Sequence, residues 1–291
     1  ISDLEILVNY TIEKYYPNIK SSKNKALDLL NVLIEKQTQL VIDWMRVGFI
    51  HGVMNTDNMS ISGETIDYGP CAFMDSYDPK TVFSSIDQLG RYAYDNQPII
   101  TKWNLTRFAE CLIPLISKNE DEAIKLATEA LDKFEKNYET KWLNMMRDKL
   151  GLYGQDKEDK NLIMELLNWM QKNKVDYTNT FIFLMNKTIK NSEVYDNANF
   201  DLWKIKWVKR LALFANTHDK SMELMSSSNP MVIPRNHKVE EALTLASNGD
   251  LTLFNRLIKI LKNPYFVNND DLEFMSPAPH SDKKYQTFCG T

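Results

Sequence analysis

The chain has 291 residues, of which 43% are hydrophobic and 25% charged, a composition typical of a soluble globular protein with a substantial core. Its 35 basic and 39 acidic residues give a net charge of −4, which disfavours nucleic acid and anionic membranes as partners. No run approaches the about 18 apolar residues of a transmembrane helix, and no signal peptide is visible. The three cysteines are too scattered to form a disulfide framework. For these reasons a cytoplasmic protein is expected.

Most of the sequence predicts α-helix. The chain opens in an amphipathic pattern without an initiating Met, which indicates a processed chain or a fragment. From Ser22 to about Val47, apolar residues recur at the three-four spacing of one buried helix face. Further helices are predicted over 103–116, 119–150, 157–173, 177–190, 199–216 and 237–262. Four residues are expected at helix ends: Asn119 and Asp250 as N-caps, and Gly151 and Gly249 as terminators.

The region 51–100 breaks this helical rhythm. It opens with HGVMNTDNMSISGETIDYGP (51–70), in which the β-like pieces 59–61 and 65–67 flank Ser62-Gly63-Glu64. This pattern predicts a small hairpin. The remainder, 68–100, predicts a long loop of the size usually kept for function. The stretches 226–236 and 263–280 are expected to be connectors.

The same stretch contains residue types that suit a metal-assisted transfer reaction. Asn58 and Asp67 carry the oxygen ligands that Mg²⁺ prefers, and a hairpin between them would bring both to one end. His51-Gly52 followed by Asn58 resembles the HGxxxxxN pattern of small-molecule kinases, and 66–69 resembles the metal-binding Asp-Phe-Gly. Such kinases place an Asp where this chain has Val53, so Asp57 is the nearest carboxylate that could deprotonate a hydroxyl. Any one of these residues alone is more often a turn former, but the ordered set favours a site.

Longer motifs resemble one known family. HGVMNTDNMSISGETIDYGPCAFMD, GRYAYDNQP (90–98) and WNLTRFAECLIPL closely resemble the selenoprotein O family of pseudokinase-like proteins, over about Gln39 to Thr291. The ending YQTFCGT is similar to that family's carboxyl terminus, where a Cys or selenocysteine lies. The resemblance implies a mainly α fold, the carboxyl-terminal lobe of a protein kinase with a small hairpin at its catalytic and metal loops.

The resemblance also implies an activity. Family members bind ATP inverted relative to kinases and transfer AMP to Ser, Thr or Tyr hydroxyls of proteins. Carried over, Asp57 falls on the proton acceptor, Asn58 and Asp67 fall on the ligands of Mg²⁺ or Mn²⁺, and Asp67 also lies against the nucleotide phosphates. Two alternatives stay open: a kinase-like phosphotransferase, and a binding module without catalysis.

The sequence lacks the motifs of the part of a kinase-like site that clamps the nucleotide. The glycines spell neither GxGxxG nor GxxxxGK, and the 50 residues before His51 predict helices. The chain is therefore expected to be one carboxyl-terminal lobe over 1–291, with site loops at 51–100, helices over 101–262 and a tail over 263–291. A partner lobe that clamps the nucleotide is expected to be missing, so the chain should fold without turning over.

Two further features have an expected role. Cys71 follows the metal loop and Cys289 lies in the tail, so a disulfide between them would pin the tail across the site, although a buried free Cys71 is the favoured state. The run 203–210 alternates Trp203 and Trp207 with basic residues. Its helical spacing predicts inward tryptophans and a solvated basic face, not a nucleic-acid site.

Overall fold

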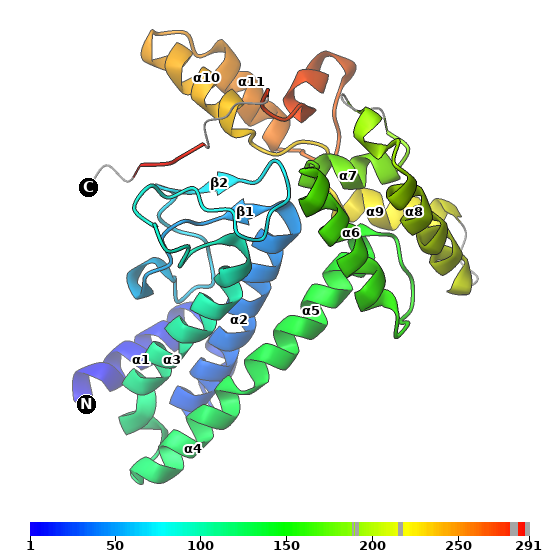
Figure 1. Ribbon diagram of the computed structural model, residues 1–291. Helices are drawn as coiled ribbons and strands as arrows, with labels where there is room; N and C mark the ends of the chain where they lie inside the picture. Colours follow the sequence, from blue (N-terminus) through cyan, green and yellow to red (C-terminus); the bar gives the residue numbers. More distant parts are fainter. Residues whose placement is uncertain (188, 190–191, 215–217, 280–284, 289–291) are drawn as a thin grey trace.

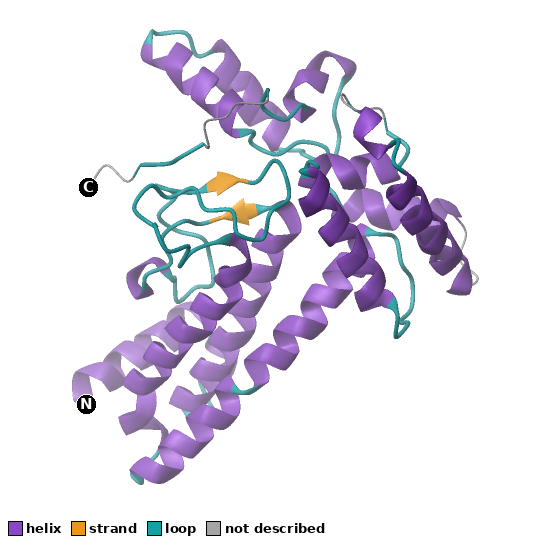
Figure 2. Cartoon of the chain, in the orientation of Figure 1, coloured by secondary structure: helices purple, strands orange, loops and turns teal. Residues whose placement is uncertain are grey.

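The computed structural model describes residues 1–187, 189, 192–214, 218–279 and 285–288, and these form a mainly helical structure (Figures 1 and 2). Its β-sheet, within those ranges, is one antiparallel pair, β1 (Phe49–Ile50) and β2 (Ala72–Phe73). Short 3-10 turns that matter for the site are η2 (Thr56–Asn58) and η3 (Tyr94–Asn96). The helices are α1 (Ser2–Tyr15), α2 (Lys25–Val47), α3 (Gln97–Ile116), α4 (Glu120–Leu131), α5 (Lys133–Lys149), α6 (Asp159–Asn173), α7 (Tyr177–Leu184), α8 (Ala198–Leu211), α9 (His218–Ser228), α10 (Asn236–Ser247) and α11 (Thr252–Leu261).

Helix α2 leads the chain into the region of the predicted site. It begins after Asn24, whose side-chain oxygen accepts a hydrogen bond from Leu27 N at 3.1 Å, and it ends at Gly48, which has φ +73°. The cap satisfies a free amide of the first turn, and glycine takes the left-handed conformation without a Cβ clash. The helix predicted over Ser22–Val47 is confirmed, with its start three residues later.

Two apolar cores meet along α2. The first lies among α1, α2, α3 and α4 and includes Val8, Leu29, Leu105 and Ala123. The second contains the carboxyl-terminal half of α2, the two strands and the helices from α5 onwards. In Figure 1, α1 to α4 gather near the amino terminus, and α5 runs from that group towards α6 and α9. The region 51–100 therefore rests on the end of α2, where both cores support it.

Several helix boundaries differ from the expected ones. Helix α3 starts at Gln97, six residues earlier than predicted. Pro98 is tolerated in the first turn of this helix, because amides of the first turn have no hydrogen-bond partner within a helix and proline lacks only that amide. Further differences are a break at Asp132 between α4 and α5, and early ends of α7 at Leu184 and of α8 at Leu211. Helix α9 was not predicted and occupies the first part of the expected connector 226–236, and a 3-10 helix over Asn269–Met275 lies in the expected connector 263–280.

The predicted helix ends are largely confirmed. Asn119 accepts from Glu122 N at 3.0 Å as the N-cap of α4. Gly151 and Gly249 follow the ends of α5 and α10 with φ of +68° and +90°. Asp250 is not the N-cap that was predicted, because α11 begins at Thr252 and its N-cap is Leu251. Asp250 does accept a hydrogen bond from Thr252 N at 2.9 Å. Among the described helices, none has the length and apolar character needed to cross a membrane.

The predicted hairpin over 59–67 is reduced to a single antiparallel bridge. Met59 pairs with Thr65 around a turn that contains Gly63 at φ +78°, while the ladder lies outside it, between Phe49–Ile50 and Ala72–Phe73. Hydrogen bonds from side chains replace hydrogen bonds between strands here. Ser60 O accepts from Gln37 Nε2 at 2.6 Å, and the Ser60 hydroxyl bonds to that of Ser62. The strands predicted at 59–61 and 65–67 are therefore wrong, although the turn is present.

Helix α8 confirms one part of the prediction for its basic run and corrects another. Trp203 and Trp207 are each 3% exposed and pack inward. Arg210, expected to be solvated, is instead buried and bonds through Nε to Asp159 Oδ1 at 2.6 Å. A guanidinium can be buried when a carboxylate satisfies it, and the carboxylate partner was not apparent from spacing along the helix.

Candidate functional site

The His51-Gly52 corner places the chain in a conformation that only glycine accepts easily. Gly52 has φ +86°, and a Cβ at this position would lie 2.6 Å from the carbonyl oxygen of Pro70. The loop that begins at His51 and the loop that ends at Pro70 therefore pack backbone to backbone. The glycine of the motif is explained by this close approach.

His51 ties the same two loops together through its side chain. The residue is fully buried, its Nε2 lies 2.8 Å from Ile66 O, and Val53 N donates to its Nδ1 at 3.4 Å. Because Ile66 O can only accept and Val53 N can only donate, both contacts fit the neutral imidazole with its proton on Nε2. Burial lowers the pKa of His51, which also favours the neutral form. His51 therefore braces the two loops through these contacts.

Buried amide side chains from α2 and α3 clamp the segment around η2. Gln37 Nε2 donates to Ser60 O, and Asn104 Nδ2 donates to Met54 O at 2.9 Å. Gln97, at the start of α3, accepts from His51 N at 3.0 Å. These amides were missed from the sequence. The available signal was a polar residue on an otherwise apolar helix face, as at Gln37, which is 2% exposed.

The three predicted site residues lie on this clamped frame. Asp57 is exposed on η2, and Asn58 next to it is half-buried. Asn58 Nδ2 donates to Val53 O at 3.1 Å, which fixes the amide and leaves its oxygen as the atom that a cation would meet. Asp67 is exposed and has φ +54°, a conformation uncommon outside glycine. Its charge acts on His51, whose pKa it raises against the larger effect of burial.

The Met59–Thr65 bridge is the element that relates these residues to one another. Because the bridge is antiparallel, the segment that precedes Met59, with Asp57 and Asn58, runs alongside the segment that follows Thr65, with Asp67. The donor set suits a hard cation, since it offers an amide oxygen and a carboxylate. In the part of the chain that the structure describes, no group of three His, Cys, Asp or Glu side chains gathers, so a bound ion would need oxygens from a nucleotide or water as well. Shared coordination by Asn58 and Asp67 stays a prediction.

The tail lies beside the same loop. Thr287 Oγ1 donates to Pro70 O at 2.6 Å, and Thr287 N donates to Phe83 O at 2.8 Å. Cys71, next to Pro70, is half-buried, and its thiol donates to Tyr68 O at 3.1 Å. Burial raises the pKa of this thiol. Cys289 lies outside the described residues, so the disulfide between Cys71 and Cys289 stays a prediction.

Comparison with known proteins identifies the family of the chain. A family model described as "Protein adenylyltransferase SelO" matches residues 1–262. The "Protein nucleotidyltransferase YdiU" of Pelagibacter ubique (strain HTCC1062) is 90% identical over 291 residues, which are 100% of this chain and 60% of the relative. Proteins of the same name from Bacillus thuringiensis (strain Al Hakam) and Alkaliphilus metalliredigens (strain QYMF) are each 48% identical, again over 100% of this chain and 60% of the relative.

The chain thus spans 60% of the length of these relatives. The family match includes the first two helices, so it reaches further towards the amino terminus than the resemblance from about Gln39 had indicated. It also includes the corner, the clamp and the bridge described above. With 262 of its 291 residues matched, the chain belongs to the SelO family, whose relatives are named protein nucleotidyltransferases.

Proposed function

We propose that the chain carries the catalytic lobe of a protein adenylyltransferase, with the arrangement of a protein-kinase carboxyl-terminal lobe. The observation that carries the proposal is the position of Asp57, Asn58 and Asp67 on two segments that the Met59–Thr65 bridge joins. Helix α2 and the His51-Gly52 corner lead into η2, which carries Asp57 and Asn58. The family and the names of the relatives support nucleotidyl transfer as the reaction class.

In the proposed reaction, a Ser, Thr or Tyr hydroxyl of a protein attacks the α-phosphorus of ATP. The new bond joins the hydroxyl oxygen to that phosphorus, the bond to the bridging oxygen breaks, and pyrophosphate leaves. Asp57 would accept the hydroxyl proton, and its exposure on η2, where a protein substrate could reach it, supports this role. Val53 cannot take this role, which argues against the kinase alternative.

Asn58 and Asp67 would hold Mg²⁺ or Mn²⁺, and Asp67 would also face the phosphates through that ion. When bound, the cation would neutralise charge on the departing pyrophosphate. The chain's own contribution is orientation, because the bond from Asn58 Nδ2 to Val53 O fixes the amide group of Asn58. His51 holds the backbone that precedes Asp67 through Ile66 O.

The experiment labels ATP separately at the α- and γ-phosphates. The 291-residue chain and the Pelagibacter ubique relative, which contains further residues, are each incubated with Mg²⁺, the labelled ATP and a protein acceptor. We propose that the relative transfers the α label alone, and that the 291 residues transfer little because part of the nucleotide clamp lies outside them. Transfer of the γ label alone would establish a kinase, and no transfer by the relative would favour a binding module.

A further inference from the structure

Two guanidinium groups lie over one exposed ring near the loop that carries Asp57. The guanidinium carbon of Arg91 lies 5.0 Å from the centroid of the Trp103 ring, and that of Arg107 lies 5.4 Å from it. All three residues are exposed. A ring in this position attracts a guanidinium and limits its motion, while the N–H groups at the edge of the guanidinium stay available for hydrogen bonds.

Buried side chains connect this surface to the loop of Asp57. The hydroxyl of Tyr92, the neighbour of Arg91, donates to Asn55 Oδ1 at 2.6 Å, two residues before Asp57. Trp103 directly precedes the α3 amide that clamps the same loop. An extended peptide advances about 3.3–3.6 Å per residue, so a peptide whose hydroxyl lies at Asp57 reaches the Arg91 guanidinium within a few residues.

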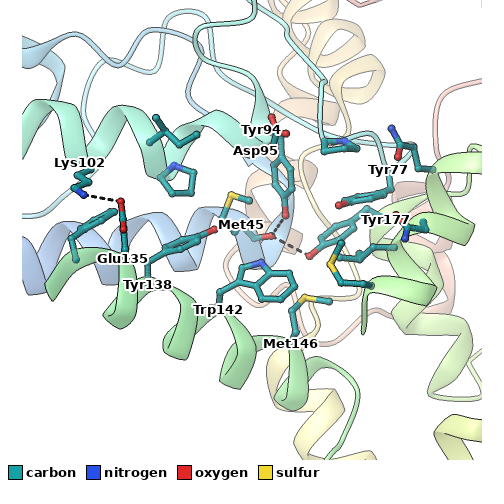
Figure 3. Close-up of a pocket in the computed structure, with 18 of the residues that line it drawn as sticks. Met45, Tyr77, Tyr94, Asp95, Lys102, Glu135, Tyr138, Trp142, Met146 and Tyr177 are labelled. Carbon is teal, nitrogen blue, oxygen red and sulfur yellow. Dashed lines mark hydrogen bonds and ion pairs between the residues drawn. The ribbon is translucent and has the colours of Figure 1, made fainter. Parts of the chain in front are cut away.

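Two other cations at this surface already have carboxylate partners. Arg107 Nη2 lies 2.7 Å from Glu110 Oε1. Lys102 Nζ lies 2.7 Å from Glu135 Oε1, and both residues line a cavity of about 720 Å³ to which Trp103 also contributes (Figure 3). Each pair is neutral as a whole, so it attracts an acidic ligand only weakly.

Arg91 has no carboxylate partner among the described residues. Asp87, four residues earlier, accepts from Arg91 N at 2.9 Å and from Tyr92 N at 2.7 Å, so each of its oxygens bonds to a backbone amide. Asp95, four residues later, pairs with Lys80 at 2.9 Å. The N–H groups of the Arg91 guanidinium are therefore open to a carboxylate from another molecule.

We propose that Arg91 is a specificity residue for the protein acceptor, and that it binds an Asp or Glu side chain within about five residues of the hydroxyl that receives AMP. This inference rests on the proposed function, which places that hydroxyl at Asp57. The planar guanidinium can donate to both oxygens of a carboxylate, and Trp103 orients it before binding. A Lys or Arg at the same place in the acceptor would be repelled.

Peptide acceptors test the inference, with the Pelagibacter ubique relative, Mg²⁺ and ATP labelled at the α-phosphate. Each peptide carries one Ser and, at one of the five positions on either side of it, Glu, Gln or Lys. At one position or more, kcat/KM for the Glu peptide should be about tenfold that for the Gln peptide, as a hydrogen bond between charged groups provides. The Lys peptide should react more slowly than both.

The outcomes separate this inference from the proposed function. Equal kcat/KM values for the three peptides at every position would overturn the role of Arg91 while AMP transfer itself is observed. Transfer to a protein acceptor but to none of the peptides would overturn recognition of a short acidic segment. Transfer to neither kind of acceptor would overturn the proposed function, and the inference with it.

Variants of the relative at the matching positions assign the preference to Arg91. Arg91→Gln should remove the about tenfold preference for Glu, and Arg91→Glu should reverse it in favour of the Lys peptide, because the sign of the recognised charge changes. Lys125→Gln, which removes a positive charge from an exposed position on α4, should keep the preference. A variant that folds poorly would lower transfer to all peptides alike, and the peptide series with the unaltered relative needs no variant. A preference for Glu that persists in Arg91→Glu would overturn the assignment.

Discussion

The imidazole Nε2 of His51 and the carbonyl oxygen of Ile66 lie 2.8 Å apart, so one buried side chain joins the loop of Asp57 to the loop of Asp67. The bond needs a proton on Nε2, and the contact from Val53 N needs a free lone pair on Nδ1. A second proton on the ring would break the Val53 contact and place a charge in the core. The neutral imidazole is therefore part of the architecture of the site.

The first prediction concerns pH. Because burial lowers the folded-state pKa of His51 below its usual value of about 6.5, the folded chain takes up this proton less readily than the unfolded chain. Its contribution to stability is complete above about pH 6.5 and is lost as the pH falls towards the folded-state pKa. Urea unfolding between neutral and acidic pH should show a steeper loss of stability in the wild type than in His51→Gln.

The control for this measurement is His218→Gln, at an exposed position at the start of α9, which should keep the wild-type slope. Some slope should also remain in His51→Gln, because burial lowers the pKa of His237 as well. A wild-type slope in the His51 variant would mean that His51 is not the group that resists protonation.

The second prediction separates the charge of Asp67 from its backbone. The residue has φ +54°, which Asn adopts more readily than most side chains, so Asp67→Asn removes the charge without new backbone strain. At the matching position of the Pelagibacter ubique relative, this change should lower AMP transfer by about 100-fold or more. The free energy of unfolding should change by less than about 0.5 kcal/mol.

Asp67→Ala serves as the contrast, because alanine in the left-handed conformation costs about 1–2 kcal/mol of stability. Both variants should lose transfer, but only the alanine variant should also unfold more easily. Retained transfer in Asp67→Asn would contradict a role of this carboxylate in holding the metal.

The outline of the frame follows from local sequence signals. The cap at Asn24, the glycine at 48 and the three-four spacing between them are enough to define α2, and the motif after it identifies where polar chemistry gathers. The hairpin was predicted to be longer than it is, because a β-like pattern does not show which groups will form hydrogen bonds with the backbone of the segment. Here Gln37, from a helix 23 residues earlier, takes Ser60 O.

Contacts between residues far apart in sequence could not be predicted. Asn104 lies 50 residues from Met54, whose carbonyl it holds, and Thr287 lies 217 residues from Pro70. The spacing of residues along the chain does not predict such pairs, because each partner is an ordinary polar residue on a helix or in the tail. The cavity of Figure 3 is likewise formed by several elements and leaves no signal in any one of them.

The third prediction concerns the buried ion cluster of Arg235, Asp75 and Asp176. Arg235 is 1% exposed, and its Nη1 lies 2.5 Å from Asp75 Oδ1 and 2.6 Å from Asp176 Oδ2. Asp176→Ala leaves the guanidinium with one carboxylate partner in a dry environment, so the free energy of unfolding should fall by about 3–5 kcal/mol. Denaturant titration measures this loss.

The exposed pair of Lys206 and Glu165, at 2.8 Å, is the matched comparison for that cluster. Glu165→Ala should cost less than about 1 kcal/mol, because solvent screens an exposed pair and both side chains are ordered at an entropic cost. Similar losses in the two variants would show that water reaches Arg235 and that the cluster is not buried in solution.

The fourth prediction uses two glycines with nearly the same backbone conformation but different surroundings. Gly249 has φ +90° and nothing within 4 Å of the position of a Cβ, so Gly249→Ala should cost only the strain of the conformation, about 1–2 kcal/mol.

Gly52 has φ +86°, and its Cβ would lie 2.6 Å from Pro70 O, a backbone atom that cannot rotate away. Gly52→Ala should therefore cost the same strain plus the displacement of the Pro70 segment, at least about 1 kcal/mol more than Gly249→Ala in urea unfolding. That displacement would also weaken the bond from Thr287 Oγ1 to Pro70 O, so the tail should become more accessible to protease in Gly52→Ala alone. Equal stabilities and equal proteolysis in the two variants would mean that the loops at His51 and Pro70 can separate freely. In that case the corner could not hold Asp57 and Asp67 in a fixed relation.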